Sequence, residues 1–395
     1  MTTATMIYNI DIYTGTTVIE NGFVVFDNGK ISTVGSMDNC TDDRFFSKKI
    51  NGTNHFLIPG MIDVHIHGAA GADTMDGDIS SLKTFAKAVV AEGTTAFLPT
   101  TITQTADTIM GALTNIANYT QQQTAQEAEI IGVHLEGPFV NVANAGAQPT
   151  QYIVDPDVKL FKKFQTAAGN LIKIVTIAPE LPNGLAFVEY LNETGVIASI
   201  GHSGATSAET DRAFAAGVKH VTHLYNGLNP FHHRAAGVVG AALFNKKAFV
   251  EMIVDGHHVD PYVVKLTYQV KGSDQILLIT DSMRAKSLED GEYELGGQTV
   301  FVKDGQARLE SGALAGSTLK MNEAVKNMLT FTDCTLADIV KMTSVNQAKQ
   351  LGIFDRKGSI SAGKDADLVM LNKNYEVVKT ICKGQIAFDK EIISN

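Results

Sequence analysis

Residues 56–68, FLIPGMIDVHIHG, place an apolar run directly before two histidines, His65 and His67. Side chains two residues apart on a strand point to the same side, so both imidazoles can face one point. Further apolar runs also end in a residue able to bind a metal, and these residues are Glu136, His202, His223 and Asp281. This recurring pattern decides the fold class.

Eight apolar, strand-like runs are predicted, and stretches with helical periodicity separate most of them. The runs are Phe56–Val64, Thr94–Leu98, Glu129–Leu135, Lys173–Ile177, Val196–Ile200, Val218–Thr222, Phe249–Val254 and Gln275–Thr280. Helices are expected over Ser81–Ala91 and after the caps Asp155-Pro156 and Asp260-Pro261. Eight strands alternating with helices predict an α/β fold, a (β/α)8 TIM-like barrel. A doubly wound open sheet is the competing fold, but no GxGxxG motif opens a strand–helix turn here.

Both ends of the chain differ from this middle. The first 56 residues contain short β segments at Met6–Tyr13, Thr17–Phe26 and Lys30–Val34, with a turn signal at residues 27–30. The last 38 residues contain similar runs at Asp367–Leu371 and Val377–Cys382. We therefore expect a small β-sandwich domain built from residues 1–56 and 358–395, flanking a barrel of residues 57–357.

Charge and cysteine content restrict the partners and the compartment. The 395 residues include 32 Lys and Arg against 42 Asp and Glu, a formal charge of −10, which disfavours nucleic acid and anionic membranes as partners. The three cysteines, Cys40, Cys334 and Cys382, follow no disulfide or CxxC pattern. Neither a signal peptide nor a membrane-spanning run is predicted, so the expected location is the cytoplasm.

Each candidate ligand also has a purely structural interpretation. A single histidine at a strand end is often a satisfied polar contact, and an aspartate there often caps the next helix. The residues coincide, however, at the carboxyl ends of five predicted strands, where barrel enzymes build their active sites. Histidine and carboxylate ligands suit a divalent metal, so a metal site is predicted. His55 and His220 are expected to be structural. His134 is expected to be structural as well, with a supporting role beside Glu136 as the alternative, because the two share a strand face.

Several longer motifs carry a family resemblance. They are PGMIDVHIHG (59–68), EGTTAFLPTTIT (92–103), HLEGPFV (134–140), IGHSGAT (200–206), THLYNGL (222–228), DGHHVD (255–260), ITDSM (279–283) and LAGSTLKMNEAVKNM (314–328). Over essentially the whole chain they resemble the amidohydrolase superfamily and, within it, the family of N-acetylglucosamine-6-phosphate deacetylases. The resemblance implies a metal-dependent hydrolase that releases acetate from this phosphosugar.

The resemblance also implies roles for the candidate ligands. Glu136, His202 and His223 would hold the principal metal, and His65 and His67 a second one. Asp281 would act as general base and then as general acid. The native metal is left open among Zn, Fe, Mn and Co, with one or two ions per subunit.

Substrate contacts are implied at Ala147, Gln148, Asn226, Gly227, Arg234, His258, Leu314, Ala315 and Gly316. Arg234 ends the cationic segment Phe231-His232-His233-Arg234, which either grips phosphate or is a solvated loop. In the family the loop that bears this arginine can reach across a dimer interface, so a homodimer is expected. Gln148 stands where many relatives carry histidine; it can donate a hydrogen bond but cannot titrate.

Two other functions compete with this interpretation. Other amidohydrolases, such as D-aminoacylases, dihydroorotases and adenine deaminases, act on N-acyl amino acids, cyclic amides or amino groups. Many of them bridge two metals with a carbamylated lysine, a role that Glu136 occupies here. A non-catalytic protein that kept the barrel and lost the metal would be expected to have lost ligands, yet all five ligands and Asp281 are intact.

Overall fold

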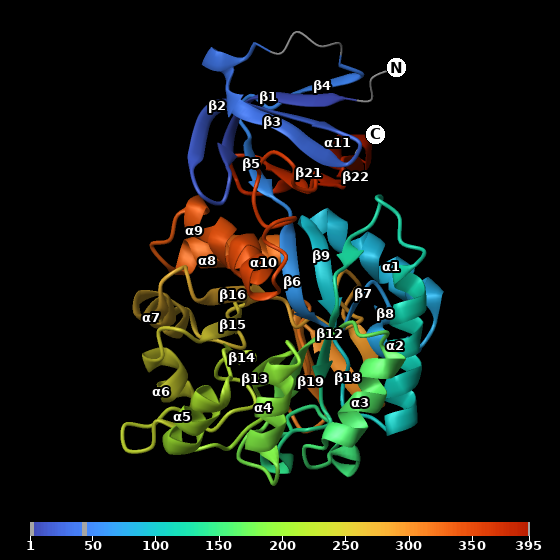
Figure 1. Cartoon of the computed structure of the whole chain (residues 1–395), viewed down its shortest axis with the longest axis vertical. Helices are drawn as coiled ribbons and strands as arrows, with labels where there is room; N and C mark the ends of the chain where they lie inside the picture. The colour runs from blue at the N-terminus through green and yellow to red at the C-terminus, as the bar shows by residue number, and fades with distance from the viewer. Residues whose placement is uncertain (1–3, 42–45, 394–395) are drawn as a thin grey trace.

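The computed structural model of the chain describes residues 4–41 and 46–393. Figure 1 shows a sheet at one end of the molecule, near both chain termini, and below it a curled set of parallel strands surrounded by helices. No helix in the described ranges combines the length and apolar character needed to cross a bilayer.

The terminal sheet combines strands from both ends of the chain. Its order is β22-β21-β20-β5-β1-β2-β3, with β4 beside β1. Its strands are β1 (Thr5–Tyr13), β2 (Val18–Asp27), β3 (Lys30–Ser36), β4 (Lys48–Asn51), β5 (Phe56–Pro59), β20 (Leu368–Leu371), β21 (Val377–Cys382) and β22 (Gln385–Asp389). The two ends meet where β5 pairs antiparallel with β20. A separate sheet from both β-rich ends is therefore observed, as the sequence predicts.

The predicted strand Phe56–Val64 is wrong as a single strand, because the chain divides at Gly60. Strand β5 ends at Pro59 in the terminal sheet, and β6 (Met61–Ile66) begins the parallel part. A Cβ atom at Gly60 would lie 2.0 Å from Oγ1 of Thr95, so only glycine permits this close approach.

The parallel strands form two sheets, ordered β10-β9-β6 and β11-β12-β13-β14-β15-β16. Their bounds are β9 (Thr94–Pro99), β10 (Glu129–Ile130), β11 (Val133–Glu136), β12 (Ile172–Ile177), β13 (Ile197–Ile200), β14 (His220–Val221), β15 (Phe249–Ile253) and β16 (Ile276–Ile279). The sheets approach each other at both edges. A bridge joins Thr100 to His134, and the Asp281 N–H donates to the His65 carbonyl at 2.9 Å.

Helices pack around the parallel strands. They are α1 (Ile79–Ala88), α2 (Ala106–Thr120), α3 (Val158–Ala167), α4 (Gly184–Glu193), α5 (Ser207–Ala216), α6 (Gly237–Phe244), α7 (Pro261–Lys271), α8 (Met321–Phe331), α9 (Leu336–Val340) and α10 (Asn346–Gln350), with α11 (Lys390–Ile393) beside the terminal sheet. The cap predicted at Asp260 is confirmed. The other two predicted starts are wrong, because Asp78 caps α1 by accepting the Ser81 N–H, and Asp157 caps α3 by accepting two N–H groups of its first turn.

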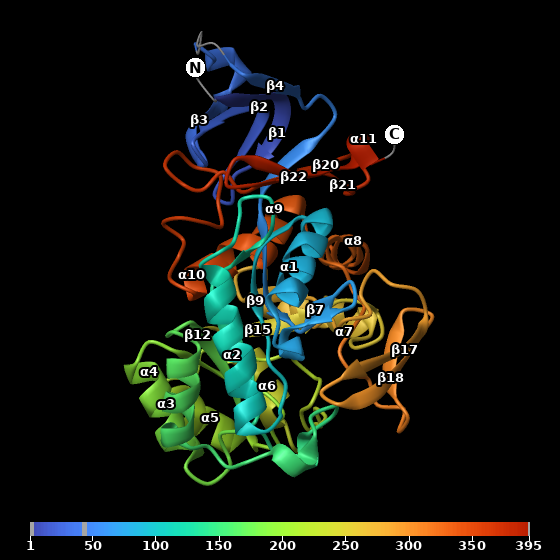
Figure 2. The same ribbon diagram turned by 90° about the vertical axis from the view of Figure 1, so that its right-hand side faces the viewer.

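A small antiparallel sheet that the sequence analysis did not predict projects from one side of the molecule (Figure 2). It consists of β17 (Gly291–Leu295), β18 (Gln298–Lys303) and β19 (Gln306–Leu309). Leu295 and Val300 share an apolar cluster with Ile102, which follows β9. The small sheet thus packs against the loop at the carboxyl end of a parallel strand. The remaining paired strands, β7 (Gly68–Ala69) and β8 (Ala72–Asp73), form a short hairpin.

A cluster of charged side chains joins the parallel part to the terminal sheet. Lys357 Nζ lies 2.8 Å from Oε2 of Glu129 on β10 and also pairs with Asp367, which directly precedes β20. Arg356 Nη1 donates to the same Glu129 oxygen at 2.9 Å. Burial alone would raise the pKa of Glu129, but Lys357 and Arg356 lower it to about 2. The ionised form of Glu129 therefore stabilises the folded chain.

Glu129→Gln should lower the free energy of unfolding by about 2–3 kcal/mol at neutral pH. Because the folded pKa lies below the ordinary value of 4.5, the stabilisation is complete above that pH and is lost as the pH falls toward 2. Urea unfolding of wild type and variant from pH 7 to pH 3 should show the difference shrinking. Glu376→Gln, a surface control whose carboxylate lies 3.1 Å from Lys390, should lower the free energy of unfolding much less, because water screens an exposed ion pair. A difference independent of pH would contradict the assignment.

Candidate metal centre

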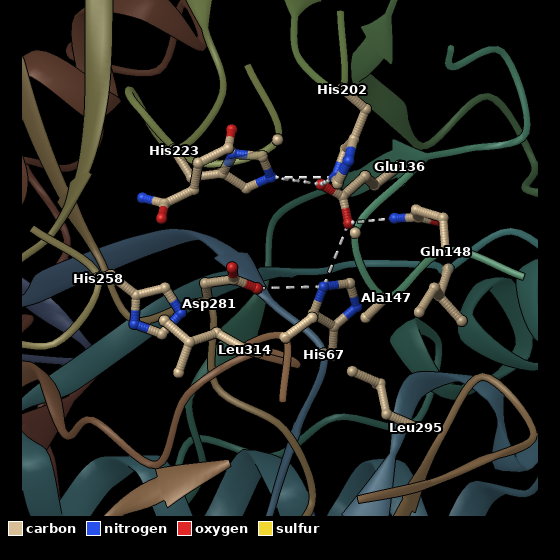
Figure 3. Close-up of a pocket in the computed structure, with 16 residues that line it drawn as sticks. His67, Glu136, Ala147, Gln148, His202, His223, His258, Asp281, Leu295 and Leu314 are labelled. Atoms are coloured by element: carbon tan, nitrogen blue, oxygen red, sulfur yellow. Dashed lines mark hydrogen bonds and ion pairs between the residues drawn. The ribbon is translucent and has the colours of Figure 1, made fainter. Parts of the chain in front are cut away.

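The five strand ends singled out in the sequence meet at one point. His65 and His67 lie at the end of β6, Glu136 ends β11, and the other three residues lie two positions after the last residues of β13, β14 and β16. All six side chains are buried or nearly so. Figure 3 shows His67, Glu136, His202, His223 and Asp281 pointing toward one another around a cavity.

Glu136 stands between two groups of histidines. Its Oε1 lies 3.0 Å from His223 Nε2 and 3.2 Å from His202 Nε2. Its Oε2 lies 3.3 Å from His67 Nε2, and Oε1 lies 3.5 Å from His65 Nε2. One carboxylate therefore faces four imidazole nitrogens, two on each side.

Asp281 lies beside the group formed by His65 and His67. Its Oδ1 lies 3.2 Å from His67 Nε2 and 3.5 Å from His65 Nε2. Burial raises the pKa of Asp281, but the neighbouring histidines, His65 foremost, shift it below the ordinary value. The carboxylate is thus ionised and oriented toward the two histidines of β6.

The backbone is strained where three of these side chains leave their strands. His202, His223 and Asp281 have φ angles of 46°, 26° and 47°, in the left-handed region that residues other than glycine seldom adopt. Such conformations cost on the order of 1–3 kcal/mol each and persist where the surrounding structure enforces them. Here they turn the side chains inward at the strand ends.

Three of the histidines are fixed through Nδ1, the ring nitrogen that faces away from the centre. In each case the partner is a backbone carbonyl. The partners of Nδ1 are the carbonyl of Thr100 for His67, of Asn144 for His202 and of Asn226 for His223, at 3.2, 2.9 and 3.0 Å. A carbonyl only accepts, so each Nδ1 carries a proton, and each ring in its neutral form presents the Nε2 lone pair to the centre. This outer contact is typical of histidines that bind metals.

The donor set fits a divalent cation. His65 Nε2 is fully buried and has no hydrogen-bond partner, and His202 Nε2 lies only 3.2 Å from His223 Nε2. Lone pairs that face each other and a carboxylate repel unless a positive charge lies among them. Burial lowers the pKa of His67, but hydrogen bonds with Asp281 and Glu136 raise it to about 9. The carboxylates therefore favour a positive charge here, and a metal ion supplies one to all the rings at once.

His134, for which a supporting role beside Glu136 was the alternative to a structural one, packs beneath His65. Its ring centroid lies 4.5 Å from that of His65, while its nitrogens contact Thr176 Oγ1 at 2.7 Å and the Val64 carbonyl at 3.0 Å. Burial first, and His65 next, lower the pKa of His134 to about 3. It is therefore a neutral residue that supports the ring of His65.

A cavity of about 270 Å³ opens beside the ligands. Several residues with predicted substrate contacts line it, and these are Ala147, Gln148, Asn226, Gly227, His258, Leu314 and Gly316. Four further residues that line the cavity were not predicted from the sequence, and these are Ile102, Gly146, Leu295 and Ala313. Leu295 belongs to the unpredicted sheet, so only recognition of that sheet could have placed it at the site.

Two predicted contacts do not line this cavity. Ala315 is fully buried in the apolar cluster beneath the small sheet, and its N–H donates to the Ala307 carbonyl at 3.0 Å, so its contact with substrate stays a prediction. Arg234 is exposed on the loop between β14 and α6, outside the cavity of its own chain. Its contact with substrate would therefore require another subunit or a movement of the loop.

Gln148 contacts the ligand carboxylate directly. Its Nε2 donates to Glu136 Oε2 at 3.0 Å, while its Oε1 accepts from the Thr103 N–H at 2.8 Å. The backbone contact fixes which end of the amide faces Glu136. Gln148 thus holds the carboxylate by a hydrogen bond, without a proton to exchange.

The chain is similar to known proteins over nearly its full length. Residues 56–387 match the model described as the amidohydrolase family. An N-acetylglucosamine-6-phosphate deacetylase of Bacillus subtilis (strain 168) is 49% identical, with 98% of each chain covered. An N-acetylgalactosamine-6-phosphate deacetylase of Escherichia coli O157:H7 is 38% identical over 84% of this chain and 87% of that protein.

A solved structure matches the same fold. It is a mutant of N-acetyl-D-glucosamine-6-phosphate deacetylase from Mycobacterium smegmatis in complex with N-acetyl-D-glucosamine 6-phosphate, with a TM-score of 0.91. The sequences are 27% identical, and the match covers 98% of this chain and 99% of that one.

Replacing His65 by Gln and His67 by Asn should lower the bound metal from about two ions per subunit toward one, because Glu136, His202 and His223 remain as ligands. Elemental analysis of the purified protein measures this directly. His55→Gln, a control outside the site, should leave the metal content unchanged. An unchanged metal content in the double variant would remove the pair from the ligand set.

Proposed function

The chain belongs to the amidohydrolase family, and on that premise we propose that it is a metal-dependent N-acetylglucosamine-6-phosphate deacetylase. It would hydrolyse the acetamide of N-acetyl-D-glucosamine 6-phosphate to D-glucosamine 6-phosphate and acetate. The observation that carries this proposal is the buried group of Glu136, His202 and His223 facing Asp281 across one cavity. The relative from Bacillus subtilis with the same activity in its name supports the substrate.

The proposed architecture is a closed (β/α)8 barrel with a small β-sandwich domain. The barrel strands would be β6, β9 and β11 to β16, and the backbone contacts between β16 and β6 support closure. The domain boundary expected at residue 56 moves to residue 59, because β5 pairs within the terminal sheet. The second boundary stays at residues 357 and 358. In this architecture the cavity lies at the carboxyl ends of the strands.

Glu136, His202 and His223 are proposed to hold the principal ion, and His65 and His67 a second ion beside the same carboxylate. The set of imidazole and carboxylate donors accepts Zn, Fe, Mn or Co. When bound, such an ion lowers the pKa of a coordinated water toward about 7 and polarises a carbonyl oxygen.

Asp281 is proposed to move the proton. As an ionised carboxylate at the edge of the cavity, it accepts a proton from the attacking water and passes it to the nitrogen of the breaking amide. Without this transfer the sugar would have to leave as an amide anion. The same side chain can serve both steps because it lies between His67 and the cavity residue His258 (Figure 3).

The remaining cavity residues are proposed to bind the sugar. His258 is held by Asp255, whose Oδ2 lies 2.6 Å from Nδ1, so its other ring nitrogen is free to contact a hydroxyl group. Asn226 and Gly227 offer polar groups beside it. Ala147, Gln148, Leu314 and Gly316 complete the walls.

We also propose that the protein is a homodimer that carries Arg234 to the cavity of the partner subunit. An apolar groove of about 1020 Å³ adjoins the Arg234 loop and includes Phe231, Phe244 and Leu266. Phe244 is 88% exposed in the single chain, and an apolar surface of this kind marks an interaction site. The proposed location is the cytoplasm, which the three cysteines favour because none forms a disulfide.

Another amidohydrolase activity, on N-acyl amino acids or cyclic amides, is the alternative. A closer alternative substrate is N-acetylgalactosamine 6-phosphate, the epimer of the proposed sugar, for which one relative is named. Acetate release from both phosphosugars and from N-acetyl amino acids separates these functions. We expect the gluco sugar to react with the highest kcat/KM.

Asp281→Asn should reduce acetate release from N-acetylglucosamine 6-phosphate by about 100-fold or more, the usual contribution of a general acid–base. Metal content and thermal unfolding should stay close to wild type, because the three principal ligands remain. Asp274→Asn, which alters a carboxylate 70% exposed at the surface, is the matched control. Normal turnover in the Asp281 variant would exclude Asp281 from the mechanism.

Arg234→Ala should reduce kcat/KM for the phosphosugar by roughly 10- to 150-fold, the value of one charge-assisted, bidentate contact, with little effect on unphosphorylated N-acetylglucosamine. Arg234→Lys should restore only part of the loss, because ammonium lacks the planar fork. Arg212→Ala, at another exposed arginine, serves as control. An equal loss on both sugars would mean that Arg234 supports the fold or the dimer instead.

A further inference from the structure

One buried carboxylate near the centre belongs to none of the roles above. Glu251 lies on β15, is fully buried, and carries its carboxylate in the interior of the curled parallel sheet. A buried charge is costly unless other groups bond to it, so its contacts are informative. Two of these contacts are with proposed metal ligands, His65 and His223.

A single oxygen of Glu251 makes both contacts. Oε2 lies 2.9 Å from Nδ1 of His65 and accepts the backbone N–H of His223 at 3.0 Å. The other oxygen, Oε1, lies 2.9 Å from Nε2 of His220, and Nδ1 of His220 lies 2.8 Å from Gln350 Nε2. Glu251 is thus held from one side by His220 and holds the two ligands on the other.

The contact with His65 differs from those of the other ligand histidines. His67, His202 and His223 direct Nδ1 at neutral backbone carbonyls, whereas the described contacts of His65 give its Nδ1 a carboxylate partner. A carboxylate partner fixes the ring and increases the electron density at its other nitrogen. That nitrogen is the buried Nε2 atom with no hydrogen-bond partner.

We propose that Glu251 is a positioning residue that holds His65 for the ion bound by His65 and His67. His220, expected from the sequence to be merely structural, positions Glu251 in turn. The inference rests on the metal centre proposed above and is independent of its substrate. On this proposal the negative charge of Glu251 favours binding of the ion at His65 and His67, and not of the ion at Glu136, His202 and His223.

The test compares Co²⁺ binding to metal-free wild type and to Glu251→Gln, by equilibrium titration and the visible spectrum of the bound ion. Glutamine keeps an acceptor for the His223 N–H but removes the charge beside His65. The Co²⁺ ion at His65 and His67 should therefore lose about 10- to 100-fold in affinity, while the ion at Glu136, His202 and His223 binds as in wild type. In a His65→Gln background, Glu251→Gln should change nothing further.

Thr210→Val is the control, because Thr210 is equally buried and its hydroxyl donates to the Thr206 carbonyl at the start of α5 rather than to the centre. Its Co²⁺ binding should equal that of wild type. Two ions with unchanged affinity in Glu251→Gln would overturn the proposal, and so would equal weakening of both ions. A wild type that binds no Co²⁺ would refute the metal centre itself, a distinguishable result.

If Glu251→Gln does not fold, the wild type loaded with Zn²⁺ gives an independent answer by NMR. The Nδ1 proton of His65 should resonate further downfield than those of His202 and His223, because it alone bonds to a carboxylate. Assignment uses the loss of the signal in His65→Gln. A His65 resonance within the range of the other two would overturn the proposal.

Discussion

The structure depends on one electrostatic constraint, a buried carboxylate that faces four imidazole lone pairs. Glu136 and the histidines around it cannot share this space without a positive charge among them. The left-handed backbone at the strand ends, the outer carbonyl partners and the curled parallel sheet all serve to hold this group together. The proposed chemistry follows, because a metal ion held by these residues would supply that charge and would activate water beside Asp281.

The sequence predicted the centre better than the elements around it. Strands that end in His65, Glu136, His202, His223 and Asp281 could be found because apolar runs and ligand residues are both local patterns. The division of the predicted strand into β5 and β6 at Gly60 could not be predicted, since it depends on contact with Thr95, a residue distant in sequence. Helix starts failed at Asp155 and Ser81 because several nearby side chains can cap a helix, and packing chooses among them.

Two further features, the small sheet and the role of Glu251, were not predicted from the sequence, and each has its own physical reason. The small sheet of β17 to β19 carries a local signal, the turn residues Gly296-Gly297, both with positive φ. Its contribution to the cavity through Leu295 depends on packing against Ile102, which no local pattern contains. Glu251 was missed for the opposite reason: it sits inside an apolar strand, where only three-dimensional contacts with His65 and His223 reveal a role.

The central claim, that Glu136, His202 and His223 hold a metal ion, is tested most directly by anomalous diffraction. Crystals of active protein, measured above and below the absorption edge of the metal found by fluorescence, should give an anomalous peak among Glu136 and the two Nε2 atoms. A second peak beside His65 and His67 would mark the second ion. A crystal of fully active protein with no anomalous peak at Glu136 would contradict the account.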